Sequence, residues 1–310
     1  MGRERRGAAT LNDYGRENRG QNQKYDRCGA IRRHRGILCN LSDISTYAAV
    51  MHRHLLAVST IFLTAATSGA ATLQGNFDRT FDVKPGVLFA LDNTNGHITI
   101  RSWDQPRIQV HAVKKVESRD SEIAKRAFDA LMIEPSVTAD AVRINTRYPK
   151  QSQGLFDWIA GTNVNMGVEY EVTVPRMANL EIDDTNGAID VSDVRGSHRL
   201  STTNGHIELL RCSGDVDAET TNGHIRAELA EVTAGKSLRL ETTNGGITVA
   251  LPRAVAARID ASTTNGSIKT DLPVTTTEFK RTSLRGTLNG GGSAELRLRT
   301  TNGSINIEAR

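Results

Sequence analysis

The feature that most constrains the fold of this chain is a pentapeptide, Thr-Asn-Gly-x-Ile, that occurs seven times along its 310 residues. Asn-Gly is the dipeptide that most readily adopts the positive φ angles of tight turns, so each copy predicts a turn between two strands. The expected turn residues are Asn95, Gly96, Asn186, Gly187, Asn204, Gly205, Asn222, Gly223, Asn244, Gly245, Asn265, Gly266, Asn302 and Gly303.

The copies recur at a nearly constant interval. From the second copy, which begins at Thr185, the successive spacings are 18, 18, 22, 21 and 37 residues. A period near 20 residues is typical of proteins that stack one small unit on the next. The last interval spans two units, which suggests that one copy has lost its signature, with a further turn at Leu288–Gly292.

Within a unit, apolar and polar residues alternate with the period of a β-strand. Ile207 and Leu209 alternate with polar neighbours, and so do Val216 and Ala218 after a turn near Cys212. Because Asn-Gly also favours hairpins, a meander or a sandwich is an alternative. The solenoid is favoured because the whole signature recurs, as expected if equivalent Thr and Asn side chains hydrogen-bond along a column. We therefore predict an all-β chain, a single β-solenoid (β-helix or β-roll) of 18–22-residue repeats.

The repeats are preceded by a region with a different pattern. Ile108–Val113 alternates as a strand, whereas Ser121–Ile133 carries an apolar face at helical spacing, with Ser121 as a candidate N-cap. We expect residues 72–180 to form a β-rich N-terminal cap with one short helix. This cap would cover the open edge of the solenoid formed by residues 181–310.

The first 71 residues carry targeting signals rather than fold signals. Met51–His54 is basic, residues 55–66 are apolar, and small residues lead up to Ala71. This order predicts a secretory signal peptide at 51–71, cleaved near Ala71, and hence an exported protein. Residues 1–50 fit either a mis-called start, with Met51 as the initiator, or a basic cytoplasmic tail on an uncleaved anchor.

The net charge of +4 is unevenly distributed. Residues 1–50 hold 10 Lys/Arg and 5 Asp/Glu, whereas residues 72–310 hold 28 Lys/Arg against 30 Asp/Glu. The repeat region is nearly neutral and has no basic stripe, which argues against nucleic acid as a partner. Of the three cysteines only Cys212 lies in the repeats, so we expect a small buried hydrophobic residue there rather than a disulfide.

Histidines and carboxylates are the residues of the repeats that could carry chemistry. His97, His206 and His224 follow Asn-Gly in three units, and His206 and His224 would stack at the strand spacing. This pair is a weak metal candidate, because a site needs three or four ligands and other units carry Ala, Gly or Ser here. The repeats lack the glycine-rich signature of calcium β-rolls, which weakens calcium binding by the aspartates. Those aspartates are Asp183, Asp184, Asp190, Asp193, Asp215 and Asp217.

An enzyme is the less favoured interpretation. Asp215 and Asp217 would point the same way at a separation that suits a glycosidase, but such pairs are common in acidic strands. No nucleophile elbow, phosphate loop, CxxC or zinc-protease motif occurs in the sequence. We predict no cofactor and name no catalytic residue. Tyr148, Phe156 and Trp158, in and beside an expected surface loop, would form either a buried cap contact or an exposed binding patch.

The second part of the chain resembles a known bacterial family. A strand that ends at Pro175 is followed by serial Thr-Asn-Gly-x-Ile units, a Leu284–Gly292 loop and a closing Leu298–Ile305 segment. These features are similar to the putative-adhesin family, the domain of unknown function numbered 4097, over residues 85–310. The resemblance implies an exported β-helical protein with an adhesive or envelope-associated role, and it implies no catalytic residues.

These observations lead to one expected function and two alternatives. We expect an exported, non-catalytic β-solenoid that acts as an adhesin or as a binding or structural module of the cell envelope. Its partner would be a glycan, an envelope component or a surface protein. The alternatives are a β-helix enzyme that degrades polysaccharides and an envelope-stress scaffold held at the membrane by an uncleaved 55–66 segment.

Overall fold

The structure, a computed structural model, describes residues 61–62, 71–149 and 164–310. All of them belong to one compact unit, Leu56–Arg310. The described part contains one helix, α2 (Ser121–Ala130). The strands are β1 (Ile61–Phe62), β2 (Ala71–Asp82), β3 (Val87–Asp92), β4 (Ile98–Trp103), β5 (Arg107–Ser118), β6 (Met132–Val137), β7 (Ala141–Arg147), β8 (Asn165–Pro175), β9 (Ala178–Asp183), β10 (Ile189–Ser192), β11 (Arg195–Asn204), β12 (Ile207–Asn222), β13 (Ile225–Leu229), β14 (Ser237–Asn244), β15 (Ile247–Leu251), β16 (Ala257–Asn265), β17 (Ile268–Thr270), β18 (Val274–Lys280), β19 (Ser283–Leu288), β20 (Ala294–Asn302) and β21 (Ile305–Ala309).

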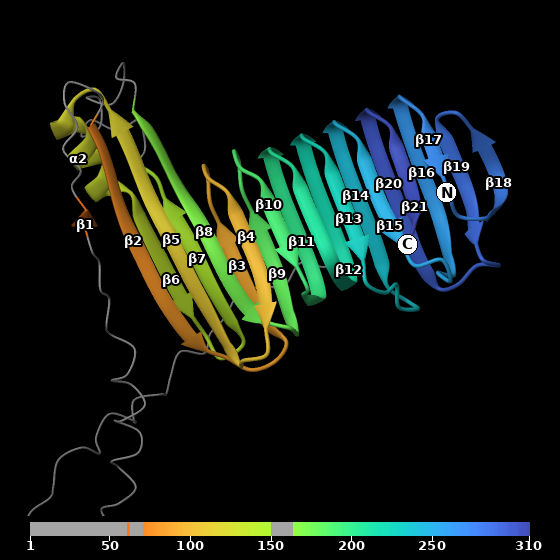
Figure 1. The fold of residues 1–310 in the computed structure, drawn as a ribbon, viewed down its shortest axis with the longest axis horizontal. Coiled ribbons are helices and arrows are strands. Elements are labelled where there is room, and N and C mark those ends of the chain that lie inside the picture. Colours follow the sequence, from red (N-terminus) through yellow and green to blue (C-terminus); the bar gives the residue numbers. More distant parts are fainter. Residues whose placement is uncertain (1–60, 63–70, 150–163) are drawn as a thin grey trace, which may run out of the picture. The chain divides into compact units, whose positions relative to one another are not determined.

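The strands form two sheets (Figure 1). Sheet A contains, in order of pairing, β1, β2, β5, β8, β4, β10, the first half of β12, β13, β15, β21 and β17. Sheet B contains β6, β7, β3, β9, β11, the second half of β12, β14, β20, β16, β19 and β18. Pairing is parallel from β8 to β17 in sheet A and from β7 to β16 in sheet B. A meander of hairpins would pair neighbours antiparallel, so the predicted β-solenoid is confirmed.

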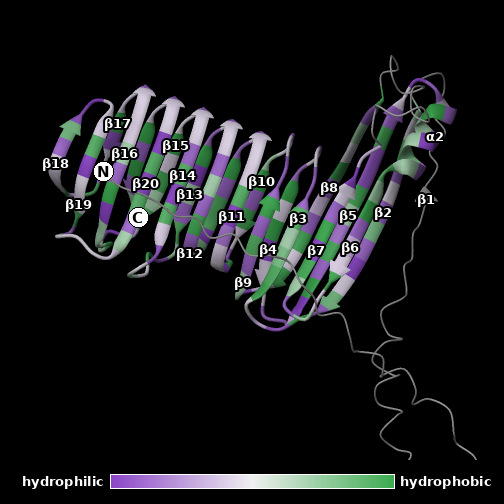
Figure 2. Cartoon of the chain, turned by 180° about the vertical axis from the view of Figure 1, so that it is seen from behind, coloured by the Kyte–Doolittle hydropathy of each residue, from purple (hydrophilic) through white to green (hydrophobic). Residues whose placement is uncertain are grey.

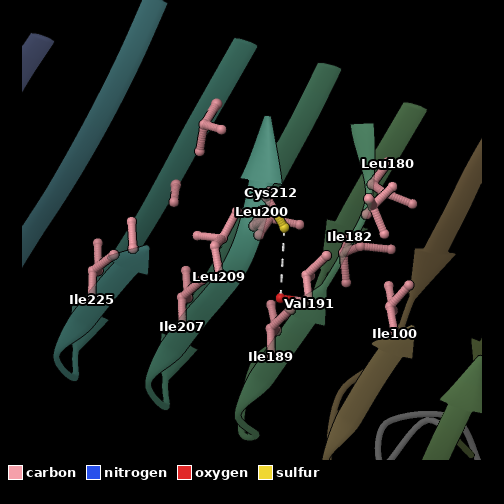
Figure 3. Close-up of a cluster of buried hydrophobic side chains, with 14 of the residues drawn as sticks. Ile100, Leu180, Ile182, Ile189, Val191, Leu200, Ile207, Leu209, Cys212 and Ile225 are labelled. Atoms are coloured by element: carbon pink, nitrogen blue, oxygen red, sulfur yellow. Dashed lines mark hydrogen bonds between the residues drawn. The ribbon is translucent and has the colours of Figure 1, made fainter. Parts of the chain in front are cut away.

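Each coil consists of a sheet B strand, the signature turn and a sheet A strand. The register between coils keeps equivalent residues opposite one another: Ile189 pairs with Ile207, and Ile207 pairs with Ile225. Every strand therefore turns the same face inward, and Figure 2 shows the resulting alternation of hydrophobic and hydrophilic residues along the strands. Between the sheets lies one hydrophobic core, in which Ile189, Ile207 and Ile225 are fully buried (Figure 3).

The coils are not stacked in sequence order at either end. The last coil, β20–β21, lies between coil β14–β15 and coil β16–β17, pairing in parallel with both. Coil β3–β4 likewise lies between the strands β7 and β8 on one side and coil β9–β10 on the other. The regular sequence spacing did not indicate this interleaving, because the signature is the same in every coil.

The long interval before the last signature holds a hairpin rather than a degenerate coil. Strands β18 and β19 pair antiparallel, and β19 pairs antiparallel with β16 at the end of sheet B. The turn expected at Leu288–Gly292 does occur after β19, with Asn289, Gly290 and Gly291 at positive φ. It returns the chain into β20, which then inserts beside β14.

Antiparallel strands also cover the other end of both sheets, where β1, β2 and β5 extend sheet A and β6 extends sheet B. Helix α2 begins after Asp120, whose carboxylate accepts hydrogen bonds from the backbone N–H groups of Glu122 and Ile123. Asp120 rather than Ser121 is thus the N-cap. The helix ends at Ala130, three residues before the predicted end, because Met132–Val137 pairs with β7 as a strand.

Several segments singled out in the sequence fall mainly outside the described residues. Of the expected signal peptide, only Ile61–Phe62 and Ala71 are described, and β1 pairs there with β2. Residues 1–50, with Cys28 and Cys39, and the loop residues Phe156 and Trp158 lie outside. Among the described residues, no helix combines the length and apolar character needed to span a membrane.

Candidate functional site

The signature turns of all seven coils align in one corner of the solenoid, where their asparagines form a continuous hydrogen-bonded column. Each Asn Nδ2 donates to the Oδ1 of the Asn in the next coil, at 2.7–2.9 Å. The column runs through Asn265, Asn302, Asn244, Asn222, Asn204, Asn186 and Asn95. It follows the spatial order of the coils rather than their order in the sequence. The expected hydrogen bonding along an Asn column is therefore present, across both interleaved ends.

The glycine of each turn is required by close packing of the coils. A Cβ on Gly205 would lie 1.9 Å from the carbonyl oxygen of Gly187, and a Cβ on Gly223 would lie 1.8 Å from that of Gly205. Among the signature Asn-Gly pairs, only Gly96 has a positive φ. The expectation that Asn-Gly is used for its positive φ is therefore wrong for the other copies. Backbone-to-backbone contact leaves no room for a side chain there.

The threonines that bond between coils are not those of the pentapeptide but those one residue earlier. Thr202 Oγ1 donates to the carbonyl oxygen of Gly187 at 3.0 Å, and Thr220 Oγ1 donates to that of Gly205 at 2.9 Å. Thr242, Thr263 and Thr300 make the equivalent bond in their coils. We call this buried position, two residues before the signature Asn, the inner corner column. The pentapeptide threonines, such as Thr203, are exposed, apart from Thr94, which is partly buried.

Two coils carry a different residue in the inner corner column. Asn93 occupies it in coil β3–β4, where its Oδ1 accepts a hydrogen bond from the Tyr148 hydroxyl at 3.0 Å. Asp184 occupies it in coil β9–β10, is 6% exposed, and has no hydrogen-bond partner for either carboxylate oxygen. A Cβ on Gly187 would lie 2.0 Å from the Gly96 carbonyl oxygen and 2.3 Å from Asp184 Oδ2. These two oxygens thus face the same small space.

The surroundings of Asp184 favour its neutral form. The pKa of Asp184 is raised to about 6, chiefly by burial and to a smaller extent by the charge of Asp92, and the nearby backbone of Thr185 only partly offsets these causes. A protonated Asp184 can donate to the Gly96 carbonyl, as Thr202 donates to Gly187 in the next coil. An ionised Asp184 cannot, because it has only acceptor atoms.

The predicted histidine candidates lie together on the outer face of sheet A. The rings of His206 and His224 stack, with centroids 4.9 Å apart and planes 4° from parallel. His97 lies two coils from His206 in the stack, and its Nε2 lies 2.9 Å from Asp190 Oδ2. His206 Nε2 lies 3.5 Å from Asp190 Oδ1. The structure therefore joins His97 and Asp190 to the two histidines that the sequence spacing had paired.

The aspartates considered for calcium or catalysis are spread over the two sheets. Asp193 forms an ion pair with Arg211 at 2.6 Å, and Asp215 forms one with Lys236 at 2.8 Å. Asp217 lies 3.5 Å from Arg239. The hydrogen bond from Lys236 lowers the pKa of Asp215, which is the opposite of what a general acid needs. Within the described ranges, no group of three or more His, Cys, Asp or Glu side chains is placed so that it could hold a metal ion.

Over the described strands, the outer face of sheet B has hollows at three places. The hollows have volumes of about 360, 290 and 320 Å³. The first spans β6, β7, β3 and β9, the second β11, β12 and β14, and the third β12, β14, β20 and β16. Their charged linings include Asp92, Glu134, Arg143, Glu181 and Asp183, then Arg199, Asp215, Asp217 and Arg239, then Glu219, Glu241 and Arg299. This row has no signal in the sequence, because it depends on which strands become neighbours.

The remaining residues that could carry chemistry, Cys212, Tyr148 and His198, are fully or partly buried. Cys212 is fully buried, as predicted, and burial raises the pKa of its thiol to about 11, so it is an inert core residue (Figure 3). Tyr148 is half-buried and bonds to the Asn95 carbonyl at 2.9 Å, which fits the cap-contact interpretation for this residue. His198, which the sequence did not single out, replaces an apolar residue of the core at 1% exposure. Burial lowers the pKa of His198 to about 4.

Comparison with known proteins gives a family for this fold. Solved structures that match the chain include a putative cell adhesion protein from Clostridium sporogenes, at 13% identity and a TM-score of 0.42, covering 75% of this chain and 99% of that one. A putative adhesin from Bacteroides fragilis shows 10% identity and a TM-score of 0.29, covering 76% and 97%. No curated protein matches the chain. The family model Toastrack DUF4097 matches residues 90–308, and the chain belongs to that family.

Proposed function

We propose that this protein is an exported, non-enzymatic binding module of the cell envelope, and that the outer face of sheet B binds an extended glycan. The observation that carries the proposal is the row of three hollows with charged side chains in their linings across β6 to β16. Coils at the strand spacing repeat similar groups along this row, so a polymer could contact several coils at once.

The side chains of the row suit a hydroxyl-rich ligand. Arg239 bonds to Glu241 of the same strand at 2.7 Å and lies 3.5 Å from Asp217 on the neighbouring strand, so guanidinium donors and carboxylate acceptors lie side by side on this face. Sugar hydroxyls both donate and accept, and can therefore bond to both kinds of group. The hollows are open to solvent and combine charged groups with apolar surface, which favours many weak contacts rather than one enclosed ligand.

Two further points support the non-enzymatic and exported parts of the proposal. The paired carboxylates Asp215 and Asp217 each lie against a basic side chain, and the hydrogen bond from Lys236 lowers the pKa of Asp215, which disfavours it as a proton donor. The basic, apolar and small-residue order of residues 51–71 supports export, with removal of this segment near Ala71. Mass spectrometry of the mature N-terminus tests that step, and an intact 51–71 segment would favour the membrane-held scaffold instead.

The binding proposal is tested with the purified protein on a panel of cell-wall and matrix polysaccharides, measuring retention and release of reducing ends together. We expect retention without release. The Arg239→Ala variant should weaken retention about tenfold, as expected for a lost charge-assisted hydrogen bond. Arg226→Ala on the outer face of sheet A is the matched control, because this exposed arginine also contacts a carboxylate, Glu208, at 3.6 Å. Release of reducing ends would show an enzyme, and equal loss in both variants would exclude sheet B as the binding face.

A further inference from the structure

A row of charged side chains crosses the outer face of sheet B from β9 to β18, with one side chain from each strand. Neighbours in this row are register partners, so their backbones lie about 4.8 Å apart. Cations and anions alternate along most of the row, which we call the charge ladder. In spatial order, the charge ladder consists of Glu181, Arg199, Asp217, Arg239, Arg297, Asp260, Arg285 and Glu278.

The alternation fails at one place, between β14 and β20. Arg239 is paired there with Arg297, whereas every other pair of neighbours in the charge ladder joins a cation to an anion. Like charges directly opposite one another destabilise a sheet. Arg239 bonds to Glu241, two residues after it in β14, and Arg297 bonds to a residue two positions before it in β20, Glu295. Since the two strands are parallel, the two guanidinium groups turn toward opposite ends of the strands.

The interleaving of the coils produces this break. Arg297 lies on β20, the strand inserted between β14 and β16, and it separates Arg239 from Asp260. The carboxylate of Asp260 is shared with two other arginines, since Arg285 lies 3.5 Å and Arg299 lies 4.0 Å from it. The insertion therefore adds a cation to the charge ladder without adding the anion that would separate it from Arg239.

The arginines at the break lie between two hollows of the proposed glycan-binding face. Arg239 lines the second hollow, and Arg299 lines the third. Arg297 is the register partner of Arg239 and lies two residues before Arg299 on the same face of β20. A polymer that occupies both hollows therefore passes over these three guanidinium groups.

We infer that the glycan bound by this face is acidic, and that one of its carboxylate or sulfate groups binds between Arg239 and Arg297. The inference rests on the proposed glycan-binding function and adds the chemical class of the ligand. A ligand anion would take the position that an Asp or Glu side chain takes elsewhere in the charge ladder. Guanidinium groups suit this role, because their N–H donors match the paired oxygens of a carboxylate or sulfate. The exposed pair of Arg239 with Glu241 is weak, so a ligand anion can replace Glu241.

The same charges decide which part of the face the acidic glycan covers. The lining of the first hollow holds four carboxylates and one arginine, so it repels an anionic sugar. The second hollow holds two arginines and two carboxylates. The acidic glycan therefore lies over the second and third hollows and ends before β9.

The inference is tested by measuring retention of the full-length protein on four polymers without added divalent ions. The polymers are polygalacturonate, its methyl ester, dextran sulfate and dextran. Each pair shares a backbone and differs in the anionic group, and the two pairs distinguish a carboxylate from a sulfate. We expect at least one acidic polymer to be retained about tenfold more strongly than its neutral counterpart, and this preference to weaken as the NaCl concentration rises.

Arg297→Gln should weaken retention of the acidic polymer about tenfold. Its thermal unfolding temperature should be unchanged or raised, because the substitution removes the repulsion from Arg239. Arg285→Gln is the matched control, since it removes the same charge from the charge ladder but at a position between two carboxylates. Arg285 lies 3.5 Å from Asp260 and 3.6 Å from Glu278. Retention of this variant should stay within about twofold of wild type.

The outcomes separate this inference from the proposed function. Equal retention of acidic and neutral polymers, weakened by Arg239→Ala, would overturn the acidic class and leave the glycan-binding face intact. Equal losses in Arg297→Gln and Arg285→Gln would also overturn it, because the polymer would then respond to overall charge. Absence of retention on these polymers and on the wider polysaccharide panel overturns both the inference and the proposed function.

Discussion

In the coils from β11 to β20 the inner corner column is threonine, whereas in coils β3–β4 and β9–β10 it is Asn93 and Asp184. The threonines each donate to a glycine carbonyl of the neighbouring coil. Asn93 also has partners, since its Nδ2 donates to the Val168 carbonyl at 3.3 Å. Asp184 alone among the described members of the column has none.

A coil can therefore stack in register even when its buried polar side chain makes no hydrogen bond to the neighbouring coil. Strand register is the same on both sides of Asp184, and Ile189 remains fully buried in its isoleucine column. Hydrophobic burial therefore holds the coil in place, at about 1.5–3 kcal/mol for each large aliphatic side chain. The residue in the inner corner column changes the stability of a coil whose register is already set by packing. At Asp184 this contribution to stability depends on pH.

We expect the largest loss of stability when a signature glycine of the threonine-containing coils is replaced by a larger residue. Gly223→Ala places a methyl group 1.8 Å from the carbonyl oxygen of Gly205, so the two coils must separate. We expect a loss of more than about 3 kcal/mol in the free energy of unfolding, measured by urea denaturation. Gly246→Ala is the control, because the nearest atom, the Ser304 carbonyl oxygen, would be 3.2 Å away and other coils carry side chains there. Equal effects of the two substitutions would refute the close-approach explanation.

Replacing Asp184 of coil β9–β10 by the threonine found in the later coils should stabilise the protein. Asp184→Thr supplies a hydroxyl that can donate to the Gly96 carbonyl at any pH. The pKa of Asp184 is raised in the folded state from 3.8 to about 6, so its stabilising contribution is complete below pH 4 and disappears as pH rises through 6. At pH 7.5 the variant should gain about 3 kcal/mol, since each pKa unit corresponds to about 1.4 kcal/mol.

Urea denaturation of wild type and Asp184→Thr at several pH values measures this gain. Asp184→Asn serves as the isosteric control, and it should gain a similar amount because its amide can also donate. A loss of stability at pH 7.5 in both variants would show that the ionised carboxylate makes a favourable contact.

His198, in the next coil, should act in the opposite direction. Burial lowers its folded-state pKa from 6.5 to about 4, so the stability of the neutral form is present above pH 6.5 and is lost as pH falls through 4. His198→Leu should remove a penalty of up to about 3 kcal/mol at pH 4, and have less effect at pH 7.5.

The two groups titrate over overlapping pH ranges with opposite sign. Wild type should therefore show a flatter pH profile of stability between pH 4 and 6 than either single variant. Denaturation of wild type, Asp184→Thr and His198→Leu across this range measures the compensation. Parallel profiles for all three proteins would contradict it.

A smaller effect is expected from interrupting the asparagine column. Asn222 donates to Asn204 at 2.8 Å and accepts from Asn244 at 2.9 Å, so Asn222→Ala removes two hydrogen bonds. At about 0.5–1.5 kcal/mol each, partly recovered by water, the expected loss is about 1–2 kcal/mol. Asn265→Ala at the end of the column removes one bond, to Asn302, and should cost about half as much in the same assay. A loss at Asn265 as large as that at Asn222, or larger, would contradict the expectation that the loss follows the number of hydrogen bonds removed.

The sequence was sufficient for the repeat fold because its signal is redundant: each coil repeats the Asn-Gly turn and the Ile207-type inward residue. It could not order the coils, since Ile247 fits beside Ile305 as well as beside Ile268. It also could not assign the hydrogen-bonding threonine, because Thr202 and Thr203 are chemically identical and only burial distinguishes them.

The candidate sites were predicted less completely than the fold. The spacing of 18 residues placed His206 beside His224, but His97 joins them only because coil β3–β4 returns to pair with coil β9–β10. The row of hollows on sheet B likewise combines Arg143 with Glu181, which are 38 residues apart and 3.3 Å apart in space. Such proximities follow from the long-range pairing of strands and have no local signal.

The insertion of coil β20–β21 between two earlier coils has a consequence for how the chain is made. During synthesis, β16 and β17 leave the ribosome before the strands that will flank them exist, and sheet B cannot join β14 to β16 until residues 294–302 have appeared. Growth of the stack from one terminus to the other is therefore impossible at this end. A chain that stops after residue 293 would lack an internal layer rather than a terminal one, so the edges of β14 and β16 would both stay open to pairing with other chains.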